Sequence, residues 1–132
     1  MIKKASIVFG ILFIVTGITG FFPNPIIGED SVFHADLVHN IVHLALGVIL
    51  VLGACKTDET ARKTMRAVSV TYMAIAIIGF VQFGGKDDSG KLLGLVGVNS
   101  ADNWLHLFLA LAIYFGMRIA GRNTESPAPT AL

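Results

Sequence analysis

The sequence has 132 residues, of which 54% are hydrophobic and 14% are charged. A soluble domain usually carries about a quarter of charged residues, and here the charges stand in short clusters between long uncharged runs, so the composition excludes an ordinary soluble domain. The net charge of +1 provides no dense basic face for phosphate groups, which argues against a nucleic-acid partner.

Four apolar stretches are long enough to be membrane-spanning helices, because a helix needs about 20 apolar residues to cross a bilayer. They cover about residues 5–22, 36–55, 67–85 and 102–119. None has the polar stripe at a helical period that a soluble helix turns to water. We therefore predict an all-α integral membrane four-helix bundle in contact with the lipid bilayer, filling one domain over residues 1–122. Residues 123–132 are predicted to form a cytoplasmic tail.

The Lys and Arg residues predict the orientation of these spans, because cytoplasmic loops of membrane proteins carry an excess of positive charge. One predicted side of the membrane carries eight of them: Lys3, Lys4, Lys56, Arg62, Lys63, Arg66, Arg118 and Arg122. The other side carries Lys86 and Lys91. The sequence therefore predicts a multi-pass protein of the bacterial inner (cytoplasmic) membrane with both termini in the cytoplasm.

The second and fourth spans share an unusual pattern. The segment 40–47 reads NIVHLALG and the segment 103–110 reads NWLHLFLA, and each follows an Ala-Asp pair. Polar residues are costly inside a span, so a shared Asn and His is more informative than a match of apolar residues. The first and third spans align more weakly, with Gly17 opposite Gly79 and Phe21 opposite Phe83. The pattern favours two helical hairpins that repeat in the same membrane orientation around a pseudo-two-fold axis along the membrane normal.

The segment 94–106, GLVGVNSADNWLH, together with NIVHLALG at 40–47, resembles a family of small bacterial four-span membrane proteins. This is domain-of-unknown-function family 4383, and the resemblance covers roughly residues 3–121. The sequence departs from the family pattern at Gly97, where Pro is expected, and at Ala110, where Gly is expected. The resemblance implies the four-span architecture and no established activity.

A cluster of polar residues is expected on the outer side of the bundle. Steps of three or four residues place side chains on one helix face, and such steps connect the polar residues of the second and fourth spans. The cluster comprises Asp36, His39, Asn40, His43, Asp102, Asn103 and His106. We interpret the Asn and His side chains as interhelical hydrogen-bond partners, which contribute about 0.6–2 kcal/mol each in a membrane.

Three functional alternatives use the same residues. His43 and His106 could be the axial ligands of a b-type haem between two helices. Asp36, His39 and His43 could bind a divalent metal ion, since His residues four apart share a helix face. The acidic outer side could also open a proton or small-solute path.

No nucleophile–base pair, phosphate-binding loop or zinc motif stands out in the sequence. The prediction is therefore a non-enzymatic structural or accessory membrane protein, with no cofactor, catalytic residue or metal ligand assigned. Assembly with a membrane-protein partner, as a subunit of a larger complex, or as a homo-oligomer stays open.

Overall fold

The computed structural model describes residues 1–83 and 89–122. Within these ranges the chain forms four helices: α1 (Ile2–Thr19), α2 (Leu37–Cys55), α3 (Asp58–Phe83) and α4 (Ser100–Arg122). All four are long and apolar enough to cross a membrane, which confirms the predicted all-α, four-span class. Lys86, Asp87 and Asp88 and the predicted tail at 123–132 lie outside the described residues.

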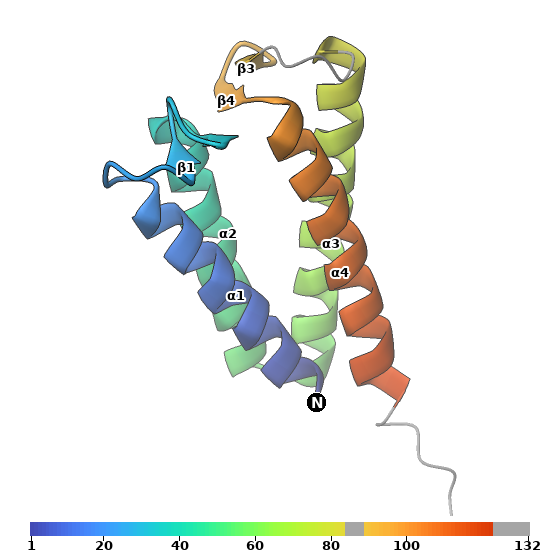
Figure 1. Cartoon of the computed structure of the whole chain (residues 1–132). Coiled ribbons are helices and arrows are strands. Elements are labelled where there is room, and N and C mark those ends of the chain that lie inside the picture. Colours follow the sequence, from blue (N-terminus) through green and yellow to red (C-terminus); the bar gives the residue numbers. More distant parts are fainter. Residues whose placement is uncertain (84–88, 123–132) are drawn as a thin grey trace, which may run out of the picture.

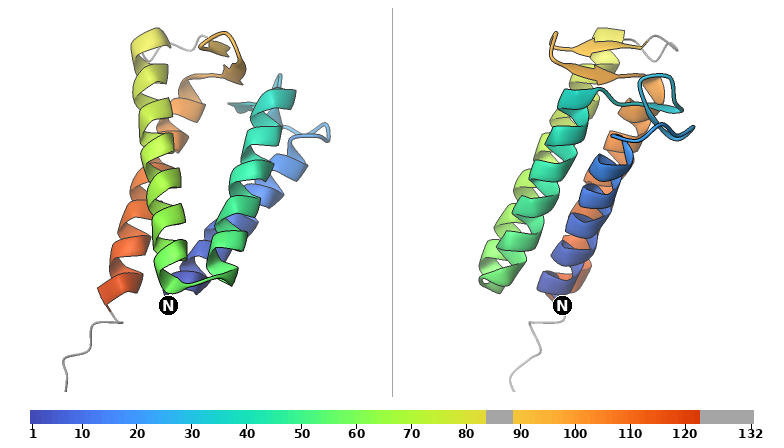
Figure 2. Two further views of the ribbon diagram at one scale, coloured as in Figure 1. Left: turned by 180° about the vertical axis from the view of Figure 1, so that it is seen from behind. Right: turned by 90° about the vertical axis from the view of Figure 1, so that its left-hand side faces the viewer.

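The helices pair as two antiparallel hairpins, α1 with α2 and α3 with α4 (Figure 1). The hairpins approach each other at the end that holds the N-terminus, here called the terminal end, and separate toward the opposite end (Figure 2). Short strands lie at that opposite end, which we call the strand end.

Small residues bring the helices of each hairpin together. A Cβ atom added at Gly47 would lie 2.7 Å from the carbonyl oxygen of Gly10, so the backbones of α1 and α2 are in direct contact there. In the other hairpin the Ser69 hydroxyl donates to the carbonyl oxygen of Ala110 at 2.8 Å. Close approach in both hairpins thus depends on small side chains in the middle of the helices.

Two glycines have matching contacts with the two asparagines of the predicted cluster. The Gly20 backbone lies against the side-chain amide of Asn40, and the Gly79 backbone lies against that of Asn103 in the same way. The contacts of Gly79 thus match those of Gly20, which lies three residues after Gly17, the residue that the sequence alignment placed opposite Gly79. Apolar helices align almost equally well in several registers, and only the packing distinguishes them.

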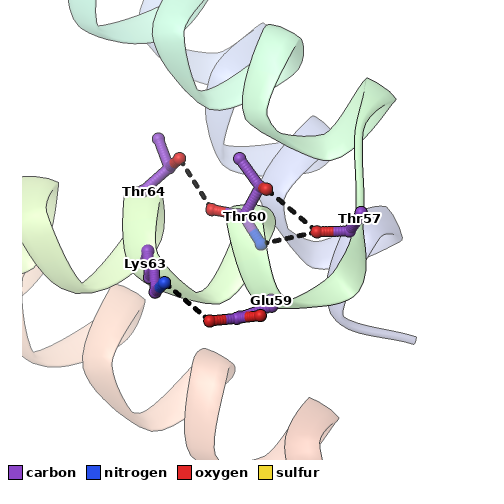
Figure 3. Close-up of polar contacts among 5 residues, drawn as sticks. All are labelled: Thr57, Glu59, Thr60, Lys63 and Thr64. Carbon is purple, nitrogen blue, oxygen red and sulfur yellow. Dashed lines mark hydrogen bonds and ion pairs between the residues drawn. The ribbon is translucent and has the colours of Figure 1, made fainter.

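Two helix boundaries differ from the limits of the apolar runs. α1 ends at Thr19, where the Asn24 amide begins to organise the turn by donating to the carbonyl oxygens of Thr19 and Phe22. α3 begins at Asp58, well before its apolar run, because the Thr57 hydroxyl accepts from the backbone N–H of Thr60 at 3.1 Å (Figure 3).

This first turn of α3 also holds an ion pair between Glu59 and Lys63 at 2.6 Å (Figure 3). Both side chains are about three-quarters exposed, so the pair contributes little to stability. The charged start of α3 thus extends the helix beyond the apolar span at the terminal end.

The strand end carries two small sheets that the sequence did not predict. β1 (Ile27–Gly28) pairs in parallel with β2 (Phe33–His34). β3 (Gly90–Leu92) pairs antiparallel with β4 (Val96–Val98), through a turn in which Leu93 and Gly94 have φ of 52° and 75°. Such positive φ values suit the tight turns of hairpins. The first connection, from α1 to α2, holds β1 and β2 and contacts α4 through β2. The second connection, from α3 to α4, holds β3 and β4 and contacts α2 through β4.

The bundle interior changes character along its length. Toward the terminal end it is apolar, with fully buried Ile2, Leu50, Met65, Ile113 and Met117. Toward the strand end the buried side chains include histidines, asparagines and a carboxylate. Large apolar side chains also point outward, as in Val81 (82% exposed), which is the expected arrangement for helices facing lipid.

Candidate functional site

The predicted polar residues lie at the strand end of the bundle. The three histidines lie between the hairpins, and Asn40 and Asn103 each pack inside one hairpin. Six are buried (His39, Asn40, His43, Asp102, Asn103 and His106), and Asp36 is partly buried. α2 and α4 place them there because these helices begin at the strand end, and Asp36 caps the first turn of α2 by accepting from the backbone N–H of His39 at 2.9 Å.

His39, His43 and His106, here called the histidine triad, form the centre of this site. One ring nitrogen from each lies within 4.8 Å of the others. The His39 and His43 rings are stacked with their centroids 4.9 Å apart, and their Nε2 atoms are 3.1 Å apart. The His106 ring lies 5.5 Å from that of His39 and 6.5 Å from that of His43. The triad therefore joins two residues of the first hairpin to one of the second.

Hydrogen bonds fix which nitrogen of His39 carries the proton. Its Nδ1 lies 2.7 Å from the carbonyl oxygen of Gly97 and 3.1 Å from that of His34. A carbonyl oxygen only accepts, so Nδ1 is the donor and Nε2 of the neutral ring holds a free lone pair. This lone pair faces His43.

The same reasoning extends to His43. Its Nε2–H donates to the lone pair on His39 Nε2, which leaves its own Nδ1 as an acceptor. The Tyr72 hydroxyl, 3.4 Å away on α3, donates to that Nδ1. The result is a directed chain of hydrogen bonds from Tyr72 through His43 and His39 to Gly97.

His106 is different, because its ring forms no hydrogen bond with the described residues. It is 3% exposed, its Nδ1 has no partner there, and the Tyr72 ring packs edge-on against it at 5.0 Å. Asn40 Oδ1 and both amide atoms of Asn103 are likewise unpartnered within the described ranges. A buried polar group without a partner costs about 1–3 kcal/mol. The site thus has binding capacity that the described protein atoms do not use.

The two carboxylates of the cluster bind backbone across the hairpins. Asp36 accepts from the backbone N–H of Gly97 at 3.0 Å, and Asp102 accepts from that of His34 at 3.0 Å. Asp36 lies at the start of α2 and binds the connection between α3 and α4. Asp102 lies at the start of α4 and binds the connection between α1 and α2. We call this pair the carboxylate clasp.

The clasp also shifts the acidity of Asp36. Partial burial by itself would raise the pKa of this carboxyl group, but the hydrogen bonds from the backbone of His39 and Gly97 and the charge of Lys91 outweigh it. The net result is a pKa below the ordinary value of 3.8. Asp36 is therefore ionised at neutral pH, and both of its oxygens are occupied by backbone donors.

Two cavities, each of about 180 Å³, flank the triad. One lies toward the first connection and is lined by Thr16, Phe33, Asp102 and all three histidines. The other lies under β3 and β4 and is lined by apolar residues with Tyr72, His39 and His106. Both cavities are smaller than pockets for drug-sized ligands, which measure about 300–1,000 Å³. The haem alternative stays a prediction.

The sequence did not identify Tyr72 or Gly97 as parts of the site. Tyr72 lies in an apolar span, where an aromatic ring is ordinarily a packing residue. The sequence feature that could have marked it as polar is its hydroxyl group, three residues after that of Ser69. Gly97 contributes backbone atoms only, and no sequence pattern marks a carbonyl oxygen that will bind a ring nitrogen. Both depend on the packing of one hairpin against the other.

Apolar helices that each suit a bilayer, around a buried polar site, define a multi-pass membrane protein in contact with lipid. The chain belongs to the family described as a domain of unknown function, DUF4383, whose model matches residues 3–118. This confirms the resemblance drawn from the sequence. No curated protein and no solved structure is significantly similar to the chain.

Proposed function

We propose that the chain is a non-enzymatic structural or accessory protein of the bacterial cytoplasmic membrane. The observation that carries this proposal is that hydrogen bonds of the polar site join the two hairpins. Tyr72 of the second hairpin donates to His43 of the first, and the carboxylate clasp connects each hairpin to the other's connection. Such bonds join the hairpins at the strand end, where the helices of the two hairpins diverge (Figure 2).

Matching contacts support an internal repeat of the hairpin. In α2 and α4, residues 63 apart correspond: Asn40 with Asn103, His43 with His106, Gly47 with Ala110. In α3, and in α1 with the residue that follows it, residues 59 apart correspond: Gly10 with Ser69, Phe13 with Tyr72, Gly20 with Gly79. Gly10 and Ser69 contact Gly47 and Ala110, and Gly20 and Gly79 contact Asn40 and Asn103. Phe13 and Tyr72 pack against His43 and His106 at ring distances of 5.5 Å and 5.0 Å.

The repeat also offers a reason for the unpartnered nitrogen of His106. The hydroxyl that bonds to His43 belongs to Tyr72, and the corresponding residue of the first hairpin is Phe13, which has no hydroxyl. His106 therefore corresponds to His43 in the repeat, but the residue that corresponds to Tyr72 offers it no hydroxyl group.

A membrane-protein partner or a second copy of the chain would meet the lipid-facing side chains, such as Trp104 and Phe108, which are 62% and 66% exposed. These residues lie on α4, outside the polar site, so assembly would leave the site intact.

The structural role predicts how His43 responds to substitution in metal-free protein. Changing His43→Ala leaves the Tyr72 hydroxyl and His39 Nε2 unpaired, and should lower the unfolding free energy by about 1–3 kcal/mol. His43→Gln keeps a donor and an acceptor and should recover much of that loss. The measurement is thermal unfolding in detergent with a chelator present. His34→Ala, whose ring bonds only to a loop carbonyl, is the control. Equal stability of the wild type and the Ala variant would contradict the structural role.

The proposed orientation has the terminal end in the cytoplasm. Lys3 and Lys56 are neighbours at this end, because the Lys3 ammonium donates to the backbone carbonyl oxygen of Lys56 at 2.6 Å, which agrees with their assignment to one side of the membrane. An alkaline phosphatase reporter, which is active only outside the cytoplasm, should be silent after Leu132 and active when inserted after Asp88. An active C-terminal fusion would reverse the orientation.

A further inference from the structure

We propose that the histidine triad binds a divalent first-row transition-metal ion of the kind that imidazole prefers, with Zn²⁺ as the reference ion. This goes beyond the structural role, because the protein would bind a metal ion. Coordinate bonds to the ion would also join the hairpins, since His39 and His43 come from α2 and His106 comes from α4. Imidazole nitrogen suits zinc, copper, nickel and iron among the biological metals.

The spacing of the nitrogens fits this chemistry. Two nitrogen ligands at about 2.0–2.1 Å from a tetrahedral ion lie roughly 3.3–3.4 Å apart. The Nε2 atoms of His39 and His43 are 3.1 Å apart, so these two rings already stand at nearly the ligand–ligand distance. The third nitrogen lies within 4.8 Å of them, and a small rotation of the His106 side chain would complete the set.

The hydrogen bonds behind the rings are those expected of metal ligands. A metal-binding His usually donates its second ring N–H to a carbonyl or carboxylate oxygen, which fixes the tautomer and the ring direction. His39 does this with the carbonyl oxygen of Gly97 at 2.7 Å. His43 can do the same with Tyr72 when its proton moves from Nε2 to Nδ1, and the hydroxyl oxygen then accepts. This change is a tautomer shift, so the site neither gains nor loses a proton.

His106 supplies an independent observation. Its ring is buried and unheld by hydrogen bonds from described residues, so a purely structural role would be served better by an apolar side chain of similar size. As a metal ligand, the same ring would exchange an unsatisfied nitrogen for a coordinate bond. The free ring can also turn to meet the ion.

The surroundings suit a cation. Asp102 lines the same cavity as the three histidines and places a buried carboxylate beside them, which offsets the charge of a divalent ion held by three neutral rings. A water occupies about 30 Å³ of liquid volume, so the cavity of about 180 Å³ has room for a water or small anion as the fourth ligand. The triad is thus a three-ligand site with one open position.

The test is Co²⁺ binding to the full chain in detergent after chelator treatment, followed by visible absorption, with Zn²⁺ as competitor. The wild type should bind one Co²⁺ per chain with the spectrum of a four-coordinate nitrogen site, and Zn²⁺ should displace it. His39→Gln and His106→Leu should each weaken binding at least tenfold, and His34→Gln, a control outside the triad, should bind like the wild type. Wild-type protein without saturable binding, triad variants that still bind, or equal loss in the control would each overturn the proposal.

His106→Leu keeps this test interpretable, because it removes an unpartnered nitrogen and should fold at least as well as the wild type without metal. Zn²⁺ should raise the thermal midpoint of the wild type and leave that of this variant unchanged. X-ray absorption at the zinc edge of the loaded wild type should then report three imidazole ligands. Fewer than two imidazoles would place the ion elsewhere and reject the triad, whatever the variants do.

Discussion

Gly47→Val is expected to destabilise the protein more than any other single change described above. A Cβ at this position would lie 2.7 Å from the Gly10 carbonyl oxygen and 2.9 Å from the Ile14 backbone nitrogen, and neither atom can move aside without moving α1. Overpacking a close contact typically costs about 1–3 kcal/mol of stability. Because the atoms that face Gly47 belong to the α1 backbone, we expect this variant to lose at least the upper value of that range. The thermal midpoint in detergent should fall sharply, with loss of helical signal at lower temperature.

The matched control is Ala45→Val, which adds a larger side chain to the same helix at a position exposed to lipid. It should change stability by less than about 0.5 kcal/mol, as surface substitutions usually do. Because His43 lies one turn from Gly47, the destabilised variant should also bind Co²⁺ more weakly if the triad is the metal site. Equal midpoints for the two variants would show that α1 and α2 do not pack through these glycines.

The spans and the identity of the polar residues could be predicted from sequence, because a bilayer imposes strong and simple constraints. A charge-free run of sufficient length has one stable form in lipid, and an Asn or His inside it needs a partner. The seven predicted cluster residues accordingly lie at the strand end of the structure. The histidines and carboxylates bridge the hairpins, and each asparagine packs inside one hairpin.

What could not be predicted depends on how the hairpins meet. The packing of α3 against α2 cannot be read from apolar sequence, and this packing places the Tyr72 hydroxyl beside one ring nitrogen of His43, whose other ring nitrogen bonds to His39. The role of Asp36 was also hidden, because its carboxylate could have joined a metal site with His39 and His43. Its two oxygens instead accept from backbone N–H groups. The side chain whose ligand atom lies close to those of His39 and His43 is His106.

Different interactions join the hairpins at the two ends of the bundle. At the terminal end apolar contacts hold the hairpins together, and at the strand end, where the hairpins separate, directional bonds take over. Such bonds depend on protonation state, which apolar contacts do not. The strand end is therefore the part of the molecule whose stability should respond to pH.

Asp36→Asn should isolate one half of the carboxylate clasp. Asn is as good a helix N-cap as Asp, so the bond from the His39 backbone can survive. The oxygen that accepts from Gly97 would become an amide NH₂ group, which faces the Gly97 N–H donor to donor. Leaving that N–H unpaired should cost about 1–3 kcal/mol at neutral pH. Asp30→Asn, at an exposed loop carboxylate, is the control and should behave like the wild type.

The pH dependence follows from the lowered pKa of Asp36. A group whose pKa is depressed in the folded state adds stability above its unfolded value, here 3.8, and loses that contribution as pH falls through the lower folded value. The wild type should therefore exceed Asp36→Asn in thermal midpoint at neutral pH, and the gap should narrow only when the pH falls below 3.8. Thermal unfolding of both proteins across this range, in one non-ionic detergent, gives the difference directly. A gap that stays constant to the lowest pH would mean that the ionised carboxylate does not hold Gly97, and the clasp would have to be abandoned.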